Sequence, residues 1–135
     1  MFKAVHPVLG ARDVTEAVAW YVERLGFREL FNDGGVLVRY AGIARDGVEL
    51  HLQWHDVSSF AAKDGDSPMY RFMVDDPDAL FEEYRDKGIF HDRTALRDTP
   101  WGTREFAFYD LNGHGLTFYR DREAPPAGGS DAKSR

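Results

Sequence analysis

The expected order of strands and helices occurs twice in this chain of 135 residues, and this repeat constrains the fold more than any other feature. Each half reads as a strand, a helix and three further strands. Aligning the halves places Asp13 on Asp75, where each helix should begin, and Gly26 on Gly88, where each should end. An aspartate oxygen caps the first N–H groups of a helix, and glycine adopts the left-handed conformation that ends one. The sequence therefore indicates an internal duplication.

The repeat predicts an α+β fold built from two βαβββ modules, at about residues 2–54 and 67–120. Each module should form a curved mixed sheet with its helix on the convex side, so that the concave faces meet around a cleft. Together they are expected to make a single domain, residues 1–121. Residues 122–135 lack the apolar side chains that a core needs, and we expect them to be a disordered tail.

Alternating side chains predict the strands of the first module. We expect strands at residues 2–9, 27–33, 36–41 and 48–54, the third with a continuation to residue 45. Pro7 in the first strand indicates an edge strand, or one that pairs outside its own module. Helical periodicity gives one apolar stripe, which consists of Val14, Ala17, Val18, Tyr21, Val22 and Leu25.

In the second module we expect strands at residues 69–74, 103–109 and 116–119, with a mostly extended segment at 89–96. A helix should open near Pro77, and Asp110, Asn112 and Gly113 supply the chemistry of a tight turn before the last strand. His114 follows in that turn and is expected to be solvated. Residues 55–65 are polar and are interpreted as the linker between the modules.

Strand parity predicts which side chains line the concave faces. In residues 48–54, Val48, Leu50, Leu52 and Trp54 suit packing under a helix, which leaves the polar side chains on the other face. The full candidate lining is His6, Glu49, His51, Gln53, Arg71, Glu105, Thr117 and Tyr119, with Trp101 at the rim. A plainer interpretation stays open, in which Glu49 and His51 are solvated on an open sheet and Arg71 is paired with Glu105.

The charge and composition exclude several classes of partner. The formal net charge is −6, whereas a general binder of nucleic acid needs a basic face, so no nucleic-acid partner is expected. The absence of cysteine removes disulfides, thiolate chemistry and cysteine-rich zinc sites. No run approaches the ~20 apolar residues that span a bilayer, and the first residues do not form a signal peptide. We therefore expect a cytoplasmic protein with no membrane partner.

Two runs of sequence resemble the vicinal oxygen chelate superfamily, also called the glyoxalase/bleomycin-resistance/extradiol-dioxygenase superfamily. The first is residues 6–14, continuing to Tyr21 and residues 25–27, and the second is residues 100–106 with residues 110–113. Both are most similar to the bleomycin-resistance proteins. The resemblance covers about residues 3–120 in order and spacing and implies the glyoxalase/bleomycin-resistance fold.

The resemblance also implies where a metal would bind. Metal-dependent members carry His or Glu at four inward positions, which here are His6, Glu49, Met69 and Thr117. His6 and Glu49 fit, whereas a thioether and a neutral hydroxyl are poor ligands for hard or borderline divalent ions. His51 shares a face with Glu49 and could complete a site. The alternative function is therefore a metal-dependent glyoxalase-like lyase or isomerase, or a dioxygenase, using one divalent ion held by His6, Glu49 and His51.

Similarity to the bleomycin-resistance proteins implies binding without chemistry, and this is the favoured interpretation. It implies a homodimer that exchanges its first strand near Pro7, and aromatic side chains that stack on a flat, cationic drug moiety. We expect a metal-free protein, with no catalytic residue and no cofactor, that sequesters an aromatic, glycopeptide-like antibiotic and so confers resistance. Arg71 favours a carboxylate or phosphate on the ligand, or an internal pair with Glu49 or Glu105. The expected ligand-binding residues are Trp101, Glu49, His51, Arg71, Glu105 and Tyr119, with Phe31, Tyr40 and Trp54 as further aromatic residues.

Overall fold

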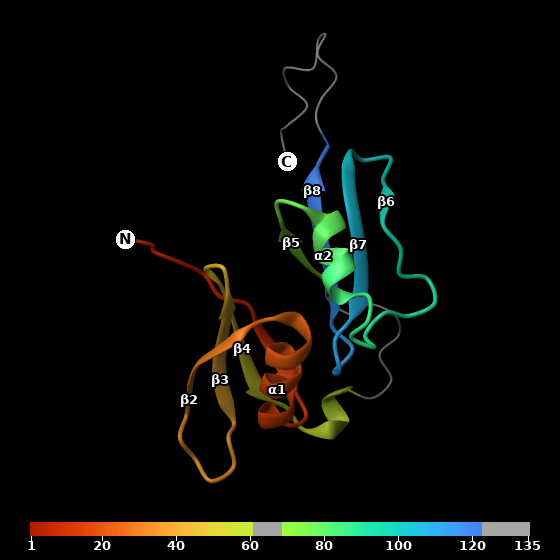
Figure 1. Ribbon diagram of the computed structural model, residues 1–135. Coiled ribbons are helices and arrows are strands. Elements are labelled where there is room, and N and C mark those ends of the chain that lie inside the picture. Colours follow the sequence, from red (N-terminus) through yellow and green to blue (C-terminus); the bar gives the residue numbers. More distant parts are fainter. Residues whose placement is uncertain (61–68, 123–135) are drawn as a thin grey trace. The chain divides into compact units, whose positions relative to one another are not determined.

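The structure, a computed structural model, describes residues 1–60 and 69–122, which divide into two compact units (Figure 1). Of the described residues, unit 1 contains 1–60 and 110–114, and unit 2 contains 69–109 and 115–122. The expected tail lies, beyond Arg122, outside the described residues, and the expectation of a single domain stays a prediction. No helix in the described part of the chain is long and apolar enough to cross a membrane.

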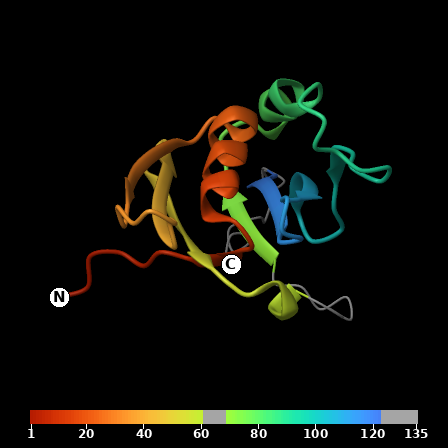
Figure 2. The ribbon, with the colours of Figure 1, turned by 90° about the horizontal axis from the view of Figure 1, so that it is seen from below.

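Unit 1 is a βαβββ module, as the repeat predicts. Its elements are β1 (Val8–Ala11), α1 (Val14–Leu25), β2 (Arg28–Asn32), β3 (Tyr40–Arg45) and β4 (Val48–Trp54). The sheet order is β1-β4-β3-β2, in which β1 pairs parallel with β4 and the other pairs are antiparallel. Helix α1 packs on one face of this sheet, and Figure 2 shows it lying across the strands.

Helix α1 begins and ends as the capping residues predict. The Asp13 side chain accepts a hydrogen bond of 3.0 Å from the Glu16 N–H, and Gly26 ends the helix at φ 80°. The buried face is the expected stripe without Val22, which is exposed. It consists of Val14, Ala17, Val18, Tyr21 and Leu25.

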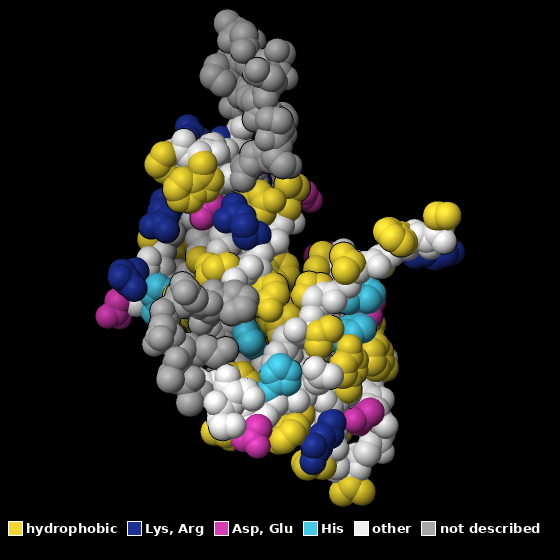
Figure 3. Space-filling model, turned by 180° about the vertical axis from the view of Figure 1, so that it is seen from behind, with side chains coloured by type: hydrophobic (Ala, Val, Ile, Leu, Met, Phe, Trp, Pro, Cys, Tyr) yellow, Lys and Arg dark blue, Asp and Glu magenta, His cyan; other side chains and the backbone are white. Residues whose placement is uncertain are grey.

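The first strand is shorter than predicted and starts later. β1 begins at Val8, while residues 1–7 have no regular secondary structure and residues 1–5 are exposed. Pro7 lacks an N–H group, although its carbonyl oxygen accepts a hydrogen bond of 2.9 Å from the His51 N–H. Figure 3 shows this N-terminal arm, residues 1–7, projecting from the body of unit 1. The prediction of a strand at residues 2–9 is therefore wrong over its first six residues, because no described strand pairs with them.

The third strand also begins later, at Tyr40 rather than at residue 36. The Asp33 carboxylate accepts hydrogen bonds from the N–H groups of Gly35 and Arg39, at 3.2 and 3.0 Å, and these bonds hold a longer loop between β2 and β3. The same bonds hold the pKa of Asp33 below its ordinary value. The β3–β4 turn has positive φ at Asp46 and Gly47, which suits a two-residue turn between antiparallel strands.

Unit 2 repeats the topology of unit 1. Its elements are β5 (Met69–Met73), α2 (Pro77–Tyr84), β6 (Arg97–Asp98), β7 (Thr103–Tyr109) and β8 (Gly115–Asp121), with sheet order β5-β8-β7-β6. β5 pairs parallel with β8, and the remaining pairs are antiparallel. Its core is aromatic, with rings in contact from Phe72, Phe81, Tyr84, Phe90, Phe106, Phe108 and Phe118.

Two expectations for unit 2 need correction. Helix α2 ends at Tyr84, so that Gly88 closes the turn after the helix rather than the helix itself. Residues 89–96 are irregular, because Phe90 turns inward to pack on Phe81 and Phe108, and only the two residues of β6 follow as strand.

The turn at residues 110–114 contacts the start of the chain within unit 1. Tyr21 donates a hydrogen bond of 2.7 Å from its hydroxyl to Asp110, and Arg12 contacts Asn112 Oδ1 through its backbone N–H and through Nη1, at 3.3 and 3.0 Å. The His114 Nε2 lies 2.7 Å from the Gly10 carbonyl oxygen, so His114 is half-buried rather than solvated. Gly10, Arg12 and Tyr21 therefore contact the turn at residues 110–114 within unit 1.

Arg104 makes an ion pair that ties β7 to α2 and predicts a dependence of stability on pH. Its Nε and Nη2 lie 2.8 and 2.9 Å from the two Asp78 carboxylate oxygens, and these hydrogen bonds lower the pKa of Asp78. A carboxyl group whose pKa is lowered on folding stabilises the folded state at pH values above its unfolded-state pKa of 3.8. This stabilisation is lost as pH falls through the folded-state pKa. Because the pair is partly exposed, Arg104→Gln should lower the free energy of unfolding by about 0.5–1 kcal/mol at pH 7.

Urea unfolding at pH 7 and at pH 2 tests this dependence. The difference between Arg104→Gln and the wild type should be smaller at pH 2, because this stabilisation is lost as pH falls through the lowered pKa of Asp78. The control Arg85→Gln removes a more exposed pair with Glu82 and should change stability less at pH 7. An equal loss for Arg104→Gln at both pH values would contradict the prediction.

Candidate functional site

Strand β4 presents two polar side chains on the face of its sheet opposite helix α1. Leu50 and Leu52 are buried under the helix, as the alternation predicts, and Glu49 and His51 point the other way. Their side chains are 27% and 16% exposed, respectively. At the ends of the strand the prediction is wrong, because Val48 and Trp54 are exposed, and Trp54 lies under the Arg39 guanidinium at 4.4 Å.

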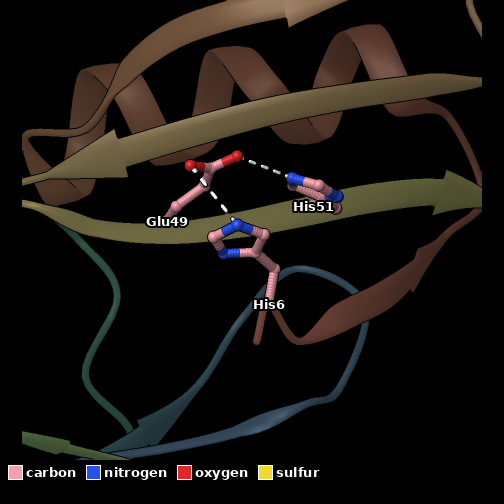
Figure 4. A group of neighbouring side chains, drawn as sticks. All are labelled: His6, Glu49 and His51. Atoms are coloured by element: carbon pink, nitrogen blue, oxygen red, sulfur yellow. Dashed lines mark hydrogen bonds and ion pairs between the residues drawn. The ribbon is translucent and has the colours of Figure 1, made fainter. Parts of the chain in front are cut away.

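His6 joins Glu49 and His51 from the N-terminal arm (Figure 4). The hydrogen bond from His51 N–H to the Pro7 carbonyl oxygen places the end of the arm beside β4. The His51 Nε2 is 2.7 Å from one Glu49 oxygen, and the His6 Nε2 is 3.7 Å from the other. One potential ligand atom from each side chain lies within 4.8 Å of the others. We call these three residues the His-Glu-His cluster.

Aromatic side chains that the sequence did not place border this cluster. The Tyr40 hydroxyl lies 2.7 Å from the His51 Nδ1, and Phe31 meets the His51 ring edge-on with centroids 5.3 Å apart. Phe31 and Tyr40 are stacked with centroids 6.3 Å apart. Gly42 pairs with His51 across the sheet, and the Phe31 ring occupies the space that a Cβ would need there. Because Gly42 has no side chain, the Phe31 ring can lie close to the sheet beside Tyr40 and His51.

A second group of the expected site residues lies on unit 2. Arg71 Nη2 is 3.3 Å from Glu105 Oε1, and the Arg71 guanidinium lies over the Tyr119 ring at 4.4 Å. Glu105 is buried and also accepts a hydrogen bond of 2.6 Å from the Thr103 hydroxyl. Arg71 therefore forms the internal pair with Glu105 that the sequence allowed. This pair reduces the attraction of Arg71 for an acidic group on a ligand.

The remaining expected residues differ in exposure. Trp101 lies in the turn before β7 and is 55% exposed, and Gln53 is exposed beside His55. Met69 is exposed, and its side chain lies beside Gly115. Thr117 is buried and pairs with Arg71 between strands β5 and β8. That these residues share one cavity with the His-Glu-His cluster stays a prediction.

The donor chemistry separates two possible metal sites. The four positions that the resemblance implies do not fit, because Met69 offers a thioether and Thr117 a buried neutral hydroxyl. The His-Glu-His cluster does fit, since two imidazoles and a carboxylate are a common donor set for zinc.

Comparisons with known proteins agree with this fold. A family model described as the "Glyoxalase/Bleomycin resistance protein/Dioxygenase superfamily" matches residues 3–118. A bleomycin resistance protein from Geobacillus stearothermophilus is 24% identical over 127 residues, which cover 84% of this chain and 93% of that protein.

Solved structures give similar matches. The bleomycin-binding protein from Streptomyces verticillus, complexed with copper(II)-bleomycin, is 32% identical, with a TM-score of 0.67 and coverage of 91% of this chain and 100% of that one. An antibiotic-binding protein from a Streptomyces species is 25% identical, with a TM-score of 0.63 and coverage of 90% and 98%. The expected glyoxalase/bleomycin-resistance fold, with two βαβββ modules, is confirmed.

Proposed function

The chain belongs to the glyoxalase/bleomycin resistance protein/dioxygenase superfamily, and from this premise we propose that it sequesters an aromatic, glycopeptide-like antibiotic by binding it without chemistry. The observation that carries the proposal is the 32% identity, over 91% of the chain, to a protein whose structure contains bleomycin. Binding of the drug is proposed to require no metal ion held by the protein.

The chemistry of the exposed side chains supports this class of ligand. Phe31 and Tyr40 offer aromatic surface beside His51, which contacts the Glu49 carboxylate, and this arrangement suits a flat group carrying positive charge. The net charge of −6 also favours a cation. Because Arg71 pairs with Glu105, an acidic group on the ligand is not needed to offset it. The proposed contacts are those of Trp101, Glu49, His51, Arg71, Glu105 and Tyr119.

Calorimetric titration of metal-free bleomycin into the protein, with EDTA present, tests the proposal. We expect saturable heat and a rise in the unfolding temperature with drug concentration, because a ligand that binds only the folded state stabilises it. Neither heat nor a thermal shift at high drug concentration would reject antibiotic binding of this type.

Replacing Trp101 with alanine should weaken drug binding if the indole stacks on the ligand. A stacked aromatic contributes about 1–3 kcal/mol, so the dissociation constant should rise roughly 5- to 150-fold. The matched control is Trp20→Ala, which removes a half-buried indole from helix α1 and should leave the affinity unchanged. Unchanged affinity in a folded Trp101→Ala variant would place the drug elsewhere.

The alternative function, a metal-dependent lyase, isomerase or dioxygenase, depends on His6, Glu49 and His51 and stays a prediction. In those reactions a bound metal supplies Lewis-acid activation of a chelating oxygen pair. Elemental analysis of the purified protein separates the two functions, because the enzyme requires a stoichiometric divalent ion.

We also propose that the protein acts as a homodimer in which the N-terminal arms are exchanged. The arm carries exposed apolar side chains at Met1, Phe2 and Val5. Strand β5 lies at the edge of its sheet, and the edge of a β5 in a second copy could accept an added strand.

A further inference from the structure

Strands β7 and β8 bring arginine side chains together on the face of their sheet that carries helix α2. Arg104 on β7 lies directly opposite Arg120 on β8, and Arg122 follows two residues later, just past the end of that strand. Because side chains alternate along a strand, this face is the one opposite Glu105 and Tyr119. The arginines are therefore separate from the proposed antibiotic contacts on the same two strands.

These arginines border a cavity of about 490 Å³ that lies within unit 2. Its lining residues are Asp98, Arg104, Arg120 and Arg122. Three guanidinium groups thus face one carboxylate, and they still outnumber the carboxylates when Asp78, which contacts Arg104 from helix α2, is counted. The cavity is positively charged although the chain as a whole has a formal net charge of −6.

The positive charges in this cavity are unequally compensated. All three guanidinium nitrogens of Arg104 donate to carboxylate oxygens of Asp78 or Asp98, at 2.8–3.1 Å. Within the described part of the chain, the half-buried Arg120 makes only a 3.5 Å contact from Nη1 to a backbone carbonyl oxygen. Arg122 approaches Asp98 no closer than 4.0 Å. Like charges directly opposite on paired strands are destabilising, so a counter-charge beside Arg120 would be favourable.

We propose that Arg120 and Arg122 bind a phosphate group, free or carried on a small molecule, in this cavity. Side chains two residues apart on an extended chain emerge about 6.6 Å from each other, a span that one oxyanion can bridge between two guanidinium groups. Each guanidinium is a planar fork that donates two parallel hydrogen bonds to an oxyanion. A carboxylate has oxygens for one fork, whereas a phosphate has enough for two.

The volume of the cavity leaves room beyond a phosphate ion. Sites for small organic ligands are typically about 300–1,000 Å³, and this cavity falls within that range. A phosphate monoester therefore fits as well as inorganic phosphate does. This inference does not rest on antibiotic binding.

NMR titration of the wild-type protein with sodium phosphate, and separately with glycerol 3-phosphate, tests the proposal. Low ionic strength is needed, because salt screens exposed charges. We expect a saturable shift of the side-chain Nε–H signals of Arg120 and Arg122, while the signal of the exposed Arg93 stays in place. Sodium chloride at matched ionic strength should give no saturation. Tighter binding of glycerol 3-phosphate would identify a monoester as the ligand, and equal affinities would show that the phosphate group alone is recognised.

Three variants separate binding from general effects on the sheet. Arg120→Gln and Arg122→Gln should each raise the phosphate dissociation constant about tenfold, because each removes charged hydrogen bonds to the ligand. The matched control Arg93→Gln, also in unit 2, should leave it unchanged. Asp98→Asn should instead lower it about three- to tenfold, because a repelling carboxylate is lost from the lining. Damage to the sheet would not tighten binding.

The wild-type titration decides the matter if a variant fails to fold. No saturable shift at Arg120 and Arg122, an equal loss of affinity in Arg93→Gln, or weaker binding in Asp98→Asn would overturn the proposal. Phosphate is titrated without drug, and the drug is titrated in buffer free of phosphate. Failure of the phosphate site and failure of antibiotic binding are therefore visible independently.

Discussion

Replacing Asp110 with alanine is expected to lower the free energy of unfolding by about 3 kcal/mol, since hydrogen bonds to a charged acceptor contribute about 1.5–3 kcal/mol each and share partners here. Asp110 is only 6% exposed, and its carboxylate accepts a bond of 2.7 Å from the buried Tyr21 hydroxyl. It also accepts from the N–H groups of Asn112 and His114, at 2.8 and 3.0 Å. One side chain thus shapes the turn and ties it to helix α1.

Urea unfolding at pH 7 measures this effect, and two variants isolate its parts. Tyr21→Phe removes one of the three bonds and should cost about 1 kcal/mol, while the exposed Asp92→Ala should stay within about 0.5 kcal/mol of the wild type. The double variant Tyr21→Phe/Asp110→Ala should be less destabilised than the sum of the single changes, because both remove the same bond. An Asp110→Ala protein as stable as Asp92→Ala would show that the turn does not hold unit 1 together.

The contacts of Asp110 give a structural role to part of the sequence run that resembles the family. Residues 110–113 were predicted only as a turn, and residues 6–14 as a strand and helix start. In the structure, Arg12 contacts Asn112 and Gly10 contacts His114. Arg12 and Asn112, one from each run, thus contribute to the scaffold of unit 1. Single-sequence reasoning missed this because the contacts join residues about 100 positions apart, and no local periodicity reports such a pair.

Local chemistry explains which elements were predictable. The bounds of β4 and β7 agree with the prediction, because each strand alternates clearly and begins beside a turn containing glycine. Aspartate caps and the glycine at position 26 likewise act within a few residues. The strand prediction for the arm and the prediction of an extended segment at residues 89–96 were wrong, because a strand-like composition forms a strand only where the backbone has a pairing partner. In the second segment the Phe90 ring instead packs against Phe108 in the core.

The same reasoning explains the candidate site. Parity on β4 was enough to put Glu49 and His51 on one face, and the Arg71–Glu105 pair was one of the options foreseen. Tyr40 was missed as a partner of His51 because alternation within a strand does not fix the register between β3 and β4. Gly42, which has no side chain and lies opposite His51, is a sequence signal for close approach by a neighbour, and in the structure that neighbour is Phe31.

Deleting residues 1–5 is expected to convert the proposed dimer into a monomer and to raise the dimer dissociation constant more than 100-fold, a change of about 2.7 kcal/mol. The deletion removes the exposed Met1, Phe2 and Val5, whose burial against a second copy would contribute about 25 cal/mol per Å². It keeps His6 and Pro7, and with them the hydrogen bond from His51 to the Pro7 carbonyl oxygen. The fold of unit 1 should therefore persist.

Sedimentation velocity over a range of concentrations measures the dimer, and circular dichroism checks the fold of each variant. The full-length variant Phe2→Ser/Val5→Ser should also weaken the dimer, because it removes the apolar contacts while leaving the arm backbone able to pair. Lys3→Ala, in the same arm, should have little effect, since an exposed charge contributes little. A wild-type protein that is monomeric at every concentration, or a truncated protein that dimerises as the wild type does, would rule out exchange of the arm. An arm that pairs with a second copy would explain why a segment with three exposed apolar side chains projects from unit 1 in the single chain (Figure 3).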